Sequence, residues 1–203
     1  MAFDLDGCLI ESRGAIVPSM RLAWAQHGLP EVDEAALHAL IGPPLEVGVR
    51  DLLVSIGEDP ALASSIVRAY RADYREHMLE RTPLVPGVAD VVRAVERACV
   101  VTSKPAVLST RIVEHLGLLD ALDFVEGPSL DMEAETKVQT LGRALERLPS
   151  ISTMVGDRHH DVDAGRAHGL RTVGVLWGMG DADELRHADI VVDTPAELAR
   201  VLT

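Results

Sequence analysis

The spacing of hydrophobic and polar residues divides the chain into stretches of different character. Between residues 11 and 84 apolar positions recur at helical spacing, as Leu62, Ile66 and Ala69 do, and no convincing strand is found there. Residues 2–5 instead form a short apolar run, and after residue 87 short apolar runs alternate with helical stretches. The pattern therefore predicts a strand, then a set of helices, then a region of alternating strands and helices.

The region after residue 87 predicts a parallel sheet. Strands are predicted at residues 99–101, 124–125, 151–155, 172–176 and 190–192, and helices at 88–98, 106–116, 135–148, 161–168 and 195–202. Alternation of this kind is typical of an α/β fold in which helices cover both faces of the sheet. We therefore predict a doubly wound, Rossmann-like core formed by residues 1–10 and 85–203. The helical segment 11–84 is an insertion into it.

Composition and charge restrict the function. The 203 residues are 47% hydrophobic and carry a net charge of -13, which suits a folded protein and argues against a nucleic-acid or membrane surface. Any site for an anion must be built locally. Seventeen arginines but only two lysines, Lys104 and Lys137, are present, so each lysine is a candidate for such a site. No secretory signal or membrane-length apolar run is found, so the expected location is the cytoplasm, as a monomer or homodimer.

The first apolar run ends in two carboxylates one residue apart. In an extended strand Asp4 and Asp6 point to the same side, and Gly7 allows a sharp turn directly afterwards. Carboxylates this close repel each other unless a cation or a shared proton separates them, and Mg²⁺ is a hard ion that prefers oxygen ligands. An Asp-Gly pair is equally typical of a solvated turn. This stretch alone leaves both interpretations open.

Further polar residues lie at the ends of other predicted strands. Thr102 and Ser103 follow residues 99–101, and Asp157 follows residues 151–155, with Asp161 nearby. Ligands of such sheets bind beyond the carboxyl ends of the strands. We therefore expect these groups to converge, together with a lysine that lies just inside a predicted helix, at residue 137.

These motifs resemble those of the haloacid dehalogenase superfamily of phosphohydrolases, with the phosphoglycolate-phosphatase-like branch closest. The matching pieces, in the order found in that family, are Asp4-Leu5-Asp6-Gly7-Cys8-Leu9, Val101-Thr102-Ser103-Lys104-Pro105, Lys137 and Gly156-Asp157-Arg158-His159-His160-Asp161. The insertion 11–84 lies where the family carries a small helical cap. The sequence departs from the family at Cys8, where threonine is usual, and in its short first strand.

The resemblance implies a role for each acidic residue. Asp4 resembles the nucleophile that accepts the phosphoryl group as an aspartyl-phosphate, and Asp6 resembles the general acid and base. The implied cofactor is Mg²⁺, with Asp4, the backbone carbonyl of Asp6 and Asp157 as ligands. Asp161 is expected to act through water or as a partner of these ligands.

The resemblance also implies a phosphate-binding set, formed by Thr102, Ser103 and Lys137. Within the insertion, Arg50 is a candidate for reading a carboxylate or second phosphate of the substrate, although an exposed helical arginine is an equally good interpretation. The insertion holds no lysine, which disfavours phosphonate-cleaving relatives that form an imine there. Phosphoglycolate, a nucleoside monophosphate and a sugar phosphate remain open as substrates.

The expected function is a magnesium-dependent phosphatase acting on a small phosphorylated metabolite. A phosphomutase of the same superfamily and a receiver-like phosphoacceptor module without enzymatic activity are the alternatives. A nucleotide-binding module would place a glycine-rich turn after its first strand, whereas Gly178-Met179-Gly180 comes late and lacks a third glycine.

Overall fold

The strands form one parallel sheet in the order β3-β2-β1-β4-β5-β6. The computed structural model describes residues 1–41, 44–130 and 135–202. The strands are β1 (Ala2–Phe3), β2 (Cys99–Val101), β3 (Phe124–Glu126), β4 (Thr153–Gly156), β5 (Arg171–Val175) and β6 (Ile190–Val192). The predicted parallel α/β sheet is confirmed, and β1 lies in its middle, between β2 and β4.

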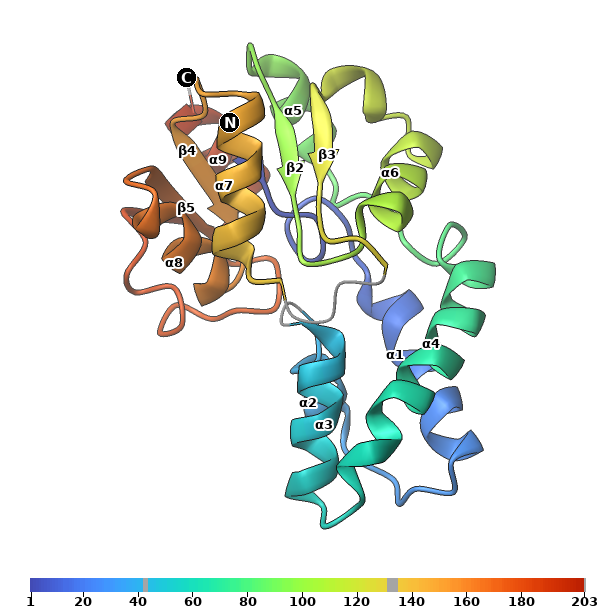
Figure 1. The fold of residues 1–203 in the computed structure, drawn as a ribbon. Coiled ribbons are helices and arrows are strands. Elements are labelled where there is room, and N and C mark those ends of the chain that lie inside the picture. Colours follow the sequence, from blue (N-terminus) through green and yellow to red (C-terminus); the bar gives the residue numbers. More distant parts are fainter. Residues whose placement is uncertain (42–43, 131–134, 203) are drawn as a thin grey trace.

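Helices cover both faces of this sheet (Figure 1). They are α5 (Val88–Ala94), α6 (Ala106–His115), α7 (Lys137–Arg147), α8 (His159–Ala167) and α9 (Pro195–Leu202), with a short 3-10 turn at Leu119–Ala121. Side chains at alternate strand positions point to opposite faces of the sheet. Ala2 and Met154 pack with residues of α7 and α8, whereas Phe3 and Val155 belong to the larger cluster on the other side.

The strand β1 is shorter than the predicted run because the chain turns immediately after it. The backbone N–H of Asp4 still donates to the carbonyl of Val155 at 2.8 Å. The Leu5 carbonyl then accepts hydrogen bonds from Leu9 at 3.0 Å and Ile10 at 3.1 Å, which closes a tight loop. Gly7 sits in this loop with a φ of 84°, a conformation that residues with a side chain rarely adopt.

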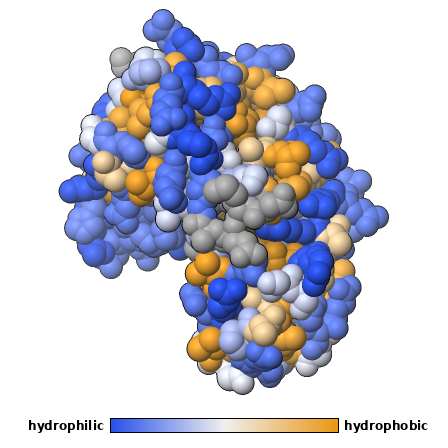
Figure 2. All heavy atoms as spheres, viewed as in Figure 1, coloured by the Kyte–Doolittle hydropathy of each residue, from blue (hydrophilic) through white to orange (hydrophobic). Residues whose placement is uncertain are grey.

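The segment between β1 and α5 forms a separate helical lobe, which we call the helical module. It contains α1 (Arg13–Gln26), α2 (Glu34–His38), α3 (Leu45–Ser55) and α4 (Ala63–His77), with a 3-10 turn at Pro60–Leu62. Figures 1 and 2 show this lobe beside one end of the sheet body, joined to it across a narrow waist. None of the helices in the described ranges is long and apolar enough to cross a membrane.

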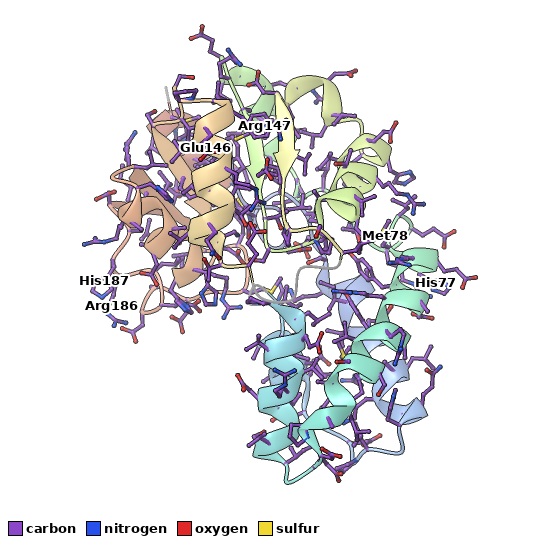
Figure 3. All side chains as sticks on the ribbon, in the orientation of Figure 1. His77, Met78, Glu146, Arg147, Arg186 and His187 are labelled. Atoms are coloured by element: carbon purple, nitrogen blue, oxygen red, sulfur yellow. The ribbon has the colours of Figure 1, made fainter. Side chains whose placement is uncertain are left out.

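Two antiparallel chain segments link the module to the sheet. Ile10 pairs with Leu84, and the Glu11 N–H donates to the carbonyl of Pro83 at 2.9 Å. The carboxyl ends of the strands face the module, so residues that follow the strands lie at the junction of the two parts. The far end of α7, where Glu146 and Arg147 lie, points away from it (Figure 3).

Candidate active site

The first acidic residue, Asp4, is held at the centre of the sheet edge that faces the module. It follows β1 directly and is 4% exposed. Its Oδ1 lies 2.5 Å from Nζ of Lys137, the first residue of α7. The same ammonium lies 2.5 Å from Oδ1 of Asp161. One buried cation therefore bridges two buried carboxylates from different elements.

Asp157 completes an acidic cluster with Asp4 and Asp161. One carboxylate oxygen from each of the three residues lies within 4.8 Å of the others. Asp157 directly follows β4, and Asp161 lies in the first turn of α8, where its Oδ2 accepts a hydrogen bond from the Arg158 N–H at 3.0 Å. Strand ends thus bring together residues that are far apart in the sequence.

The cluster carries more negative charge than its surroundings neutralise. Burial raises the pKa of Asp4 to about 7, although the Lys137 ammonium opposes the rise. Burial and the nearby Asp4 also raise the pKa of Asp157 well above its ordinary value. Among the described residues, Oδ1 of Asp157 is buried and finds no hydrogen-bond partner. A set of oxygen donors with an unpartnered buried oxygen fits a hard divalent cation such as Mg²⁺.

Glycines surround Asp157 and leave no room for side chains. A Cβ at Gly7 or Gly178 would collide with the Asp157 side chain, and one at Gly180 would collide with its carbonyl oxygen. The Met179 N–H donates to Oδ2 of Asp157 at 2.7 Å. The Gly178-Met179-Gly180 stretch, unremarkable as a nucleotide-binding motif, is therefore a backbone cradle for this carboxylate. The sequence signal for this role was the position of the stretch, just beyond the strand predicted at residues 172–176.

Asp6 faces a different cation from Asp4. Its Oδ1 forms an ion pair with Nζ of Lys104, and that ammonium lies 5.1 Å from the ring centroid of Tyr74 in α4. Burial alone would lower the pKa of Lys104, and the Asp6 carboxylate reverses this effect and raises it. The Asp6 side chain is not part of the acidic cluster, so the ligand expected from this residue is its backbone carbonyl. The sequence prediction included Lys137 but not Lys104 in the phosphate-binding set, although the scarcity of lysine pointed to both residues.

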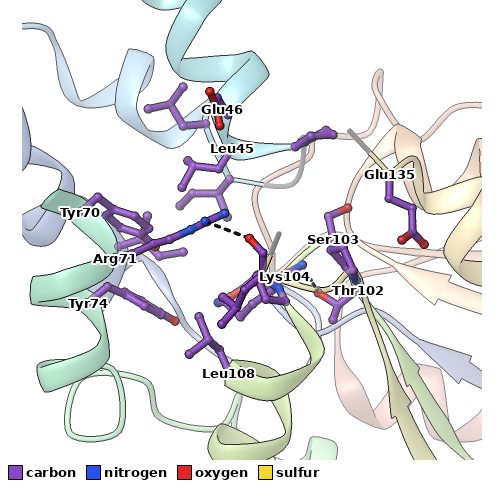
Figure 4. Close-up of a pocket in the computed structure, with 18 of the residues that line it drawn as sticks. Leu45, Glu46, Tyr70, Arg71, Tyr74, Thr102, Ser103, Lys104, Leu108 and Glu135 are labelled. Atoms are coloured by element: carbon purple, nitrogen blue, oxygen red, sulfur yellow. Dashed lines mark hydrogen bonds and ion pairs between the residues drawn. The ribbon is translucent and has the colours of Figure 1, made fainter. Parts of the chain in front are cut away.

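Thr102 and Ser103 follow β2 and line a cavity between the sheet and the module (Figure 4). Thr102 is 1% exposed, and its Oγ1 accepts a hydrogen bond from the Lys104 N–H at 3.1 Å. The cavity has a volume of 330 Å³, and Asp4, Asp6 and Lys137 line its sheet side. The predicted catalytic and phosphate-binding residues thus line one cavity.

The module supplies a different arginine from the one expected. Arg50 lies outside the set of described residues that line the cavity; its Nη2 is 3.6 Å from Oε1 of Glu46, and its side chain is 53% exposed. Arg71, in α4, lines the cavity instead and reaches across it (Figure 4). Arg50 lies on α3 and Arg71 on α4, and both helices are amphipathic. The sequence alone could therefore not show which of the two arginines faces the sheet.

Comparisons with known proteins agree with this geometry. Residues 1–175 match the family described as haloacid dehalogenase-like hydrolase. Over 201 residues the chain is 37% identical to the tyrosine-protein kinase PtkA of Mycobacterium tuberculosis, covering 96% of this chain and 67% of that protein. It is 31% identical to the phosphoglycolate phosphatase of Chromobacterium violaceum, covering 98% and 93% of the two chains.

The fold has a close counterpart among solved structures. A predicted phosphatase from Clostridium acetobutylicum superimposes with a TM-score of 0.89 at 28% identity, over 99% of this chain and 96% of that one. The ordered motifs, the parallel sheet and the family match all point the same way. The chain belongs to the haloacid dehalogenase-like hydrolases.

Proposed function

We propose that this protein is a magnesium-dependent phosphatase that hydrolyses a small phosphomonoester through an aspartyl-phosphate on Asp4. The observation that carries the proposal is the position of Asp4. It lines the cavity, belongs to the acidic cluster and contacts Lys137 at 2.5 Å. A carboxylate nucleophile needs a cavity for its substrate and positive charge beside the transferring oxygens, and this position provides for both.

In the first step an Asp4 oxygen attacks the phosphorus atom, and the bond between phosphorus and the ester oxygen breaks. Asp6 donates a proton to that departing oxygen, which leaves as an alcohol. In the second step Asp6 takes a proton from water, whose oxygen attacks the phosphorus of the aspartyl-phosphate. The bond between phosphorus and the Asp4 oxygen breaks, phosphate leaves, Asp4 is a carboxylate again and Asp6 again holds a proton.

The acidic cluster is the proposed metal site. Asp4, Asp157, Asp161 and the backbone carbonyl of Asp6 would hold Mg²⁺. When bound, Mg²⁺ supplies positive charge next to the phosphoryl oxygens. Thr102, Ser103 and Lys137 are the proposed phosphate-binding residues; Lys137 is already at the cavity wall between two carboxylates.

We also propose that residues 11–84 act as a cap on a catalytic core formed by residues 1–10 and 85–203. The two antiparallel linking segments supply a pivot, and residues of α1, α3 and α4 line the cavity opposite the strand ends. Closure of such a part over the site would exclude water other than the attacking molecule.

The test is phosphate release from a panel of phosphomonoesters, including phosphoglycolate and nucleoside monophosphates, with and without Mg²⁺. We expect release to need Mg²⁺ and the Asp4→Asn variant to lose about a thousandfold or more, because its amide cannot act as the nucleophile. Asp163→Asn, at an exposed position of α8, is the matched control. Near-normal turnover of Asp4→Asn would overturn the mechanism.

The similarity to a protein named as a tyrosine-protein kinase supports a second candidate, transfer of a phosphoryl group to a hydroxyl acceptor. The same aspartyl-phosphate could be attacked by an acceptor oxygen in place of water, which also describes a phosphomutase. Incubation with γ-labelled ATP and a tyrosine-containing peptide, and a separate incubation with a sugar phosphate, distinguish these outcomes. Label in the peptide indicates a kinase, an isomerised sugar phosphate indicates a mutase, and label released as free phosphate indicates hydrolysis.

A further inference from the structure

The described acidic side chains of the cavity form ion pairs, and Arg71 differs from the other cavity cations because it belongs to none of these pairs. Each acidic side chain that lines the cavity, among the residues that the structure describes, contacts a cation within ion-pair distance. The pairs are Asp4 with Lys137, Asp6 with Lys104, Glu46 with Arg50, and Glu135 with Arg143. Away from the acidic cluster, the described carboxylates of the cavity wall are therefore already paired with cations.

Among the described residues that line the cavity, Arg71 is the cation that contacts a neutral group and not a carboxylate. Its Nη1 donates to the backbone carbonyl of Leu130 at 3.3 Å, and within the described ranges of the chain no carboxylate forms an ion pair with it. A guanidinium offers five N–H donors in a planar fork that matches a carboxylate or a phosphate. One long hydrogen bond leaves most of that capacity facing the cavity (Figure 4).

Apolar side chains make up part of the cavity wall, alongside the polar and charged groups of the site. Both parts of the molecule contribute to it, with Ile16, Leu40, Ile41, Pro44, Leu45 and Tyr70 from the module and Leu108 and Leu130 from the sheet side. The 330 Å³ volume falls within the range of pockets that enclose whole organic ligands. A two-carbon alcohol part would leave much of this apolar wall uncovered, whereas a larger apolar body would cover it.

The tyrosine rings are already occupied by other contacts. Tyr74 faces the Lys104 ammonium, and Tyr70 stacks on Tyr74 with centroids 5.2 Å apart. These contacts help to hold α4 in place. Arg71, the residue next to Tyr70, extends from α4 over the cavity. The Arg71 side chain thus starts on the module side, and its guanidinium reaches across the cavity to the Leu130 carbonyl.

We propose that Arg71 determines the substrate: it binds an anionic group, a carboxylate or a second phosphate, at the far end of an apolar or aromatic alcohol part. This inference rests on the proposed phosphatase function and makes it more specific. The transferred phosphate lies at Asp4, the apolar body lies against the aliphatic wall, and the second anion meets Arg71. Arg71 is a specificity residue, because it touches the substrate away from the reacting atoms.

The experiment compares esters that differ in one charge. Phenyl phosphate is paired with 4-carboxyphenyl phosphate and with a phenyl ester that carries a second phosphate. Phosphoglycolate is paired with ethyl phosphate. We expect the wild-type protein to prefer the doubly anionic aryl esters in kcat/KM. Arg71→Gln should lower kcat/KM for them by about tenfold to a hundredfold, while phenyl phosphate changes less than about twofold. The two doubly anionic esters show which anion is preferred.

Arg75→Gln is the matched control, because Arg75 is exposed on the same helix. An equal fall for charged and neutral esters in Arg71→Gln, or no fall for either, would overturn the proposal. Binding of 4-carboxybenzyl phosphonate and benzyl phosphonate, measured by calorimetry with Mg²⁺, separates this result from failure of the phosphatase function. Absence of hydrolysis with an Arg71-dependent preference for the carboxylate supports the recognition alone, and absence of that preference refutes it.

Discussion

The buried side chain of Asp157 fits a metal ligand but lowers the stability of the metal-free protein. It is 0% exposed and receives a hydrogen bond from Met179 at 2.7 Å on one oxygen, while the other oxygen has no partner among the described residues. A buried charge beside Asp4 and Asp161 destabilises the metal-free protein. Because a bound cation would offset this repulsion, metal binding and stability should be coupled at this residue.

We therefore predict that Asp157→Asn stabilises the metal-free protein and weakens its metal site. The amide removes a buried charge and can keep the Met179 hydrogen bond, so the free energy of unfolding in EDTA should rise by about 1–3 kcal/mol. The Mg²⁺ concentration for half-maximal phosphate release should rise about tenfold or more. Urea denaturation and a Mg²⁺ titration measure the two effects, with Asp163→Asn as control. A less stable metal-free variant with an unchanged Mg²⁺ requirement would contradict this account.

The sequence predicts those site residues that follow strands directly. Asp4, Thr102 and Asp157 are recognisable because each belongs to a short motif at the end of an apolar run, and the sheet brings these ends together. Arg71 is different. Its position depends on how the helical module sits against the sheet, and a contact between distant parts of the chain leaves no local pattern in either part.

At the scale of elements, α7 begins with a capping box that also places a site residue. The Thr136 N–H donates to Oε1 of Gln139 at 2.9 Å, and the Gln139 N–H donates to Oγ1 of Thr136 at 3.3 Å. These bonds satisfy backbone groups that a helix start leaves free. Lys137 is the next residue, so the cap fixes the point from which its side chain reaches Asp4.

Thr136→Ala should lower the free energy of unfolding by about 0.5–2 kcal/mol, because the reciprocal cap is lost. Thr136→Ser keeps a hydroxyl that can accept the same bond, and we expect it to recover most of the loss. Urea denaturation in EDTA measures both variants without a contribution from metal binding. If the serine variant lost as much stability as the alanine variant, the cap would not be the source of the effect.

Element boundaries deviate from prediction where a distant contact decides the backbone. The helix predicted to end at residue 98 ends at Ala94, and Val95 is already extended. Arg97 pairs with Asp123 at 2.8 Å, and the Ala98 N–H donates to the same carboxylate at 3.1 Å. This side chain lies 25 residues further along the chain. The helical spacing of residues up to 98 therefore gives no indication of this contact with Asp123.

At the scale of the molecule, the sheet body and the module contact each other across the cavity through arginines. Nη1 of Arg158 donates to the Ile41 carbonyl at 2.6 Å, and its Nε pairs with Glu184 at 2.7 Å. Arg158 directly follows Asp157 in the chain. The loop that carries the proposed metal ligands therefore contacts the module through Arg158. Glu184 orients the Arg158 guanidinium for its hydrogen bond to Ile41.

This connection predicts a variant that loosens the module without changing the proposed nucleophile, Asp4. Arg158→Gln removes the hydrogen bond to Ile41, so the closed arrangement should be less populated and kcat/KM for phosphate release should fall about threefold to tenfold. Glu184→Gln, which leaves Arg158 in place with a weaker orienting partner, should show a smaller fall in the same direction. Arg186→Gln is the control, because that guanidinium is 59% exposed and pairs at the surface with Asp183.

Small-angle scattering separates closure from an effect on the metal loop. If Arg158 holds the module against the sheet, the radius of gyration of Arg158→Gln should exceed that of the wild-type protein in the absence of ligand, and the Mg²⁺ requirement should stay within about twofold. A higher Mg²⁺ requirement at an unchanged radius would mean that Arg158 acts by shaping the loop at Asp157. In that case the two lobes would be held together by packing around the antiparallel linking segments, where Ile10 pairs with Leu84.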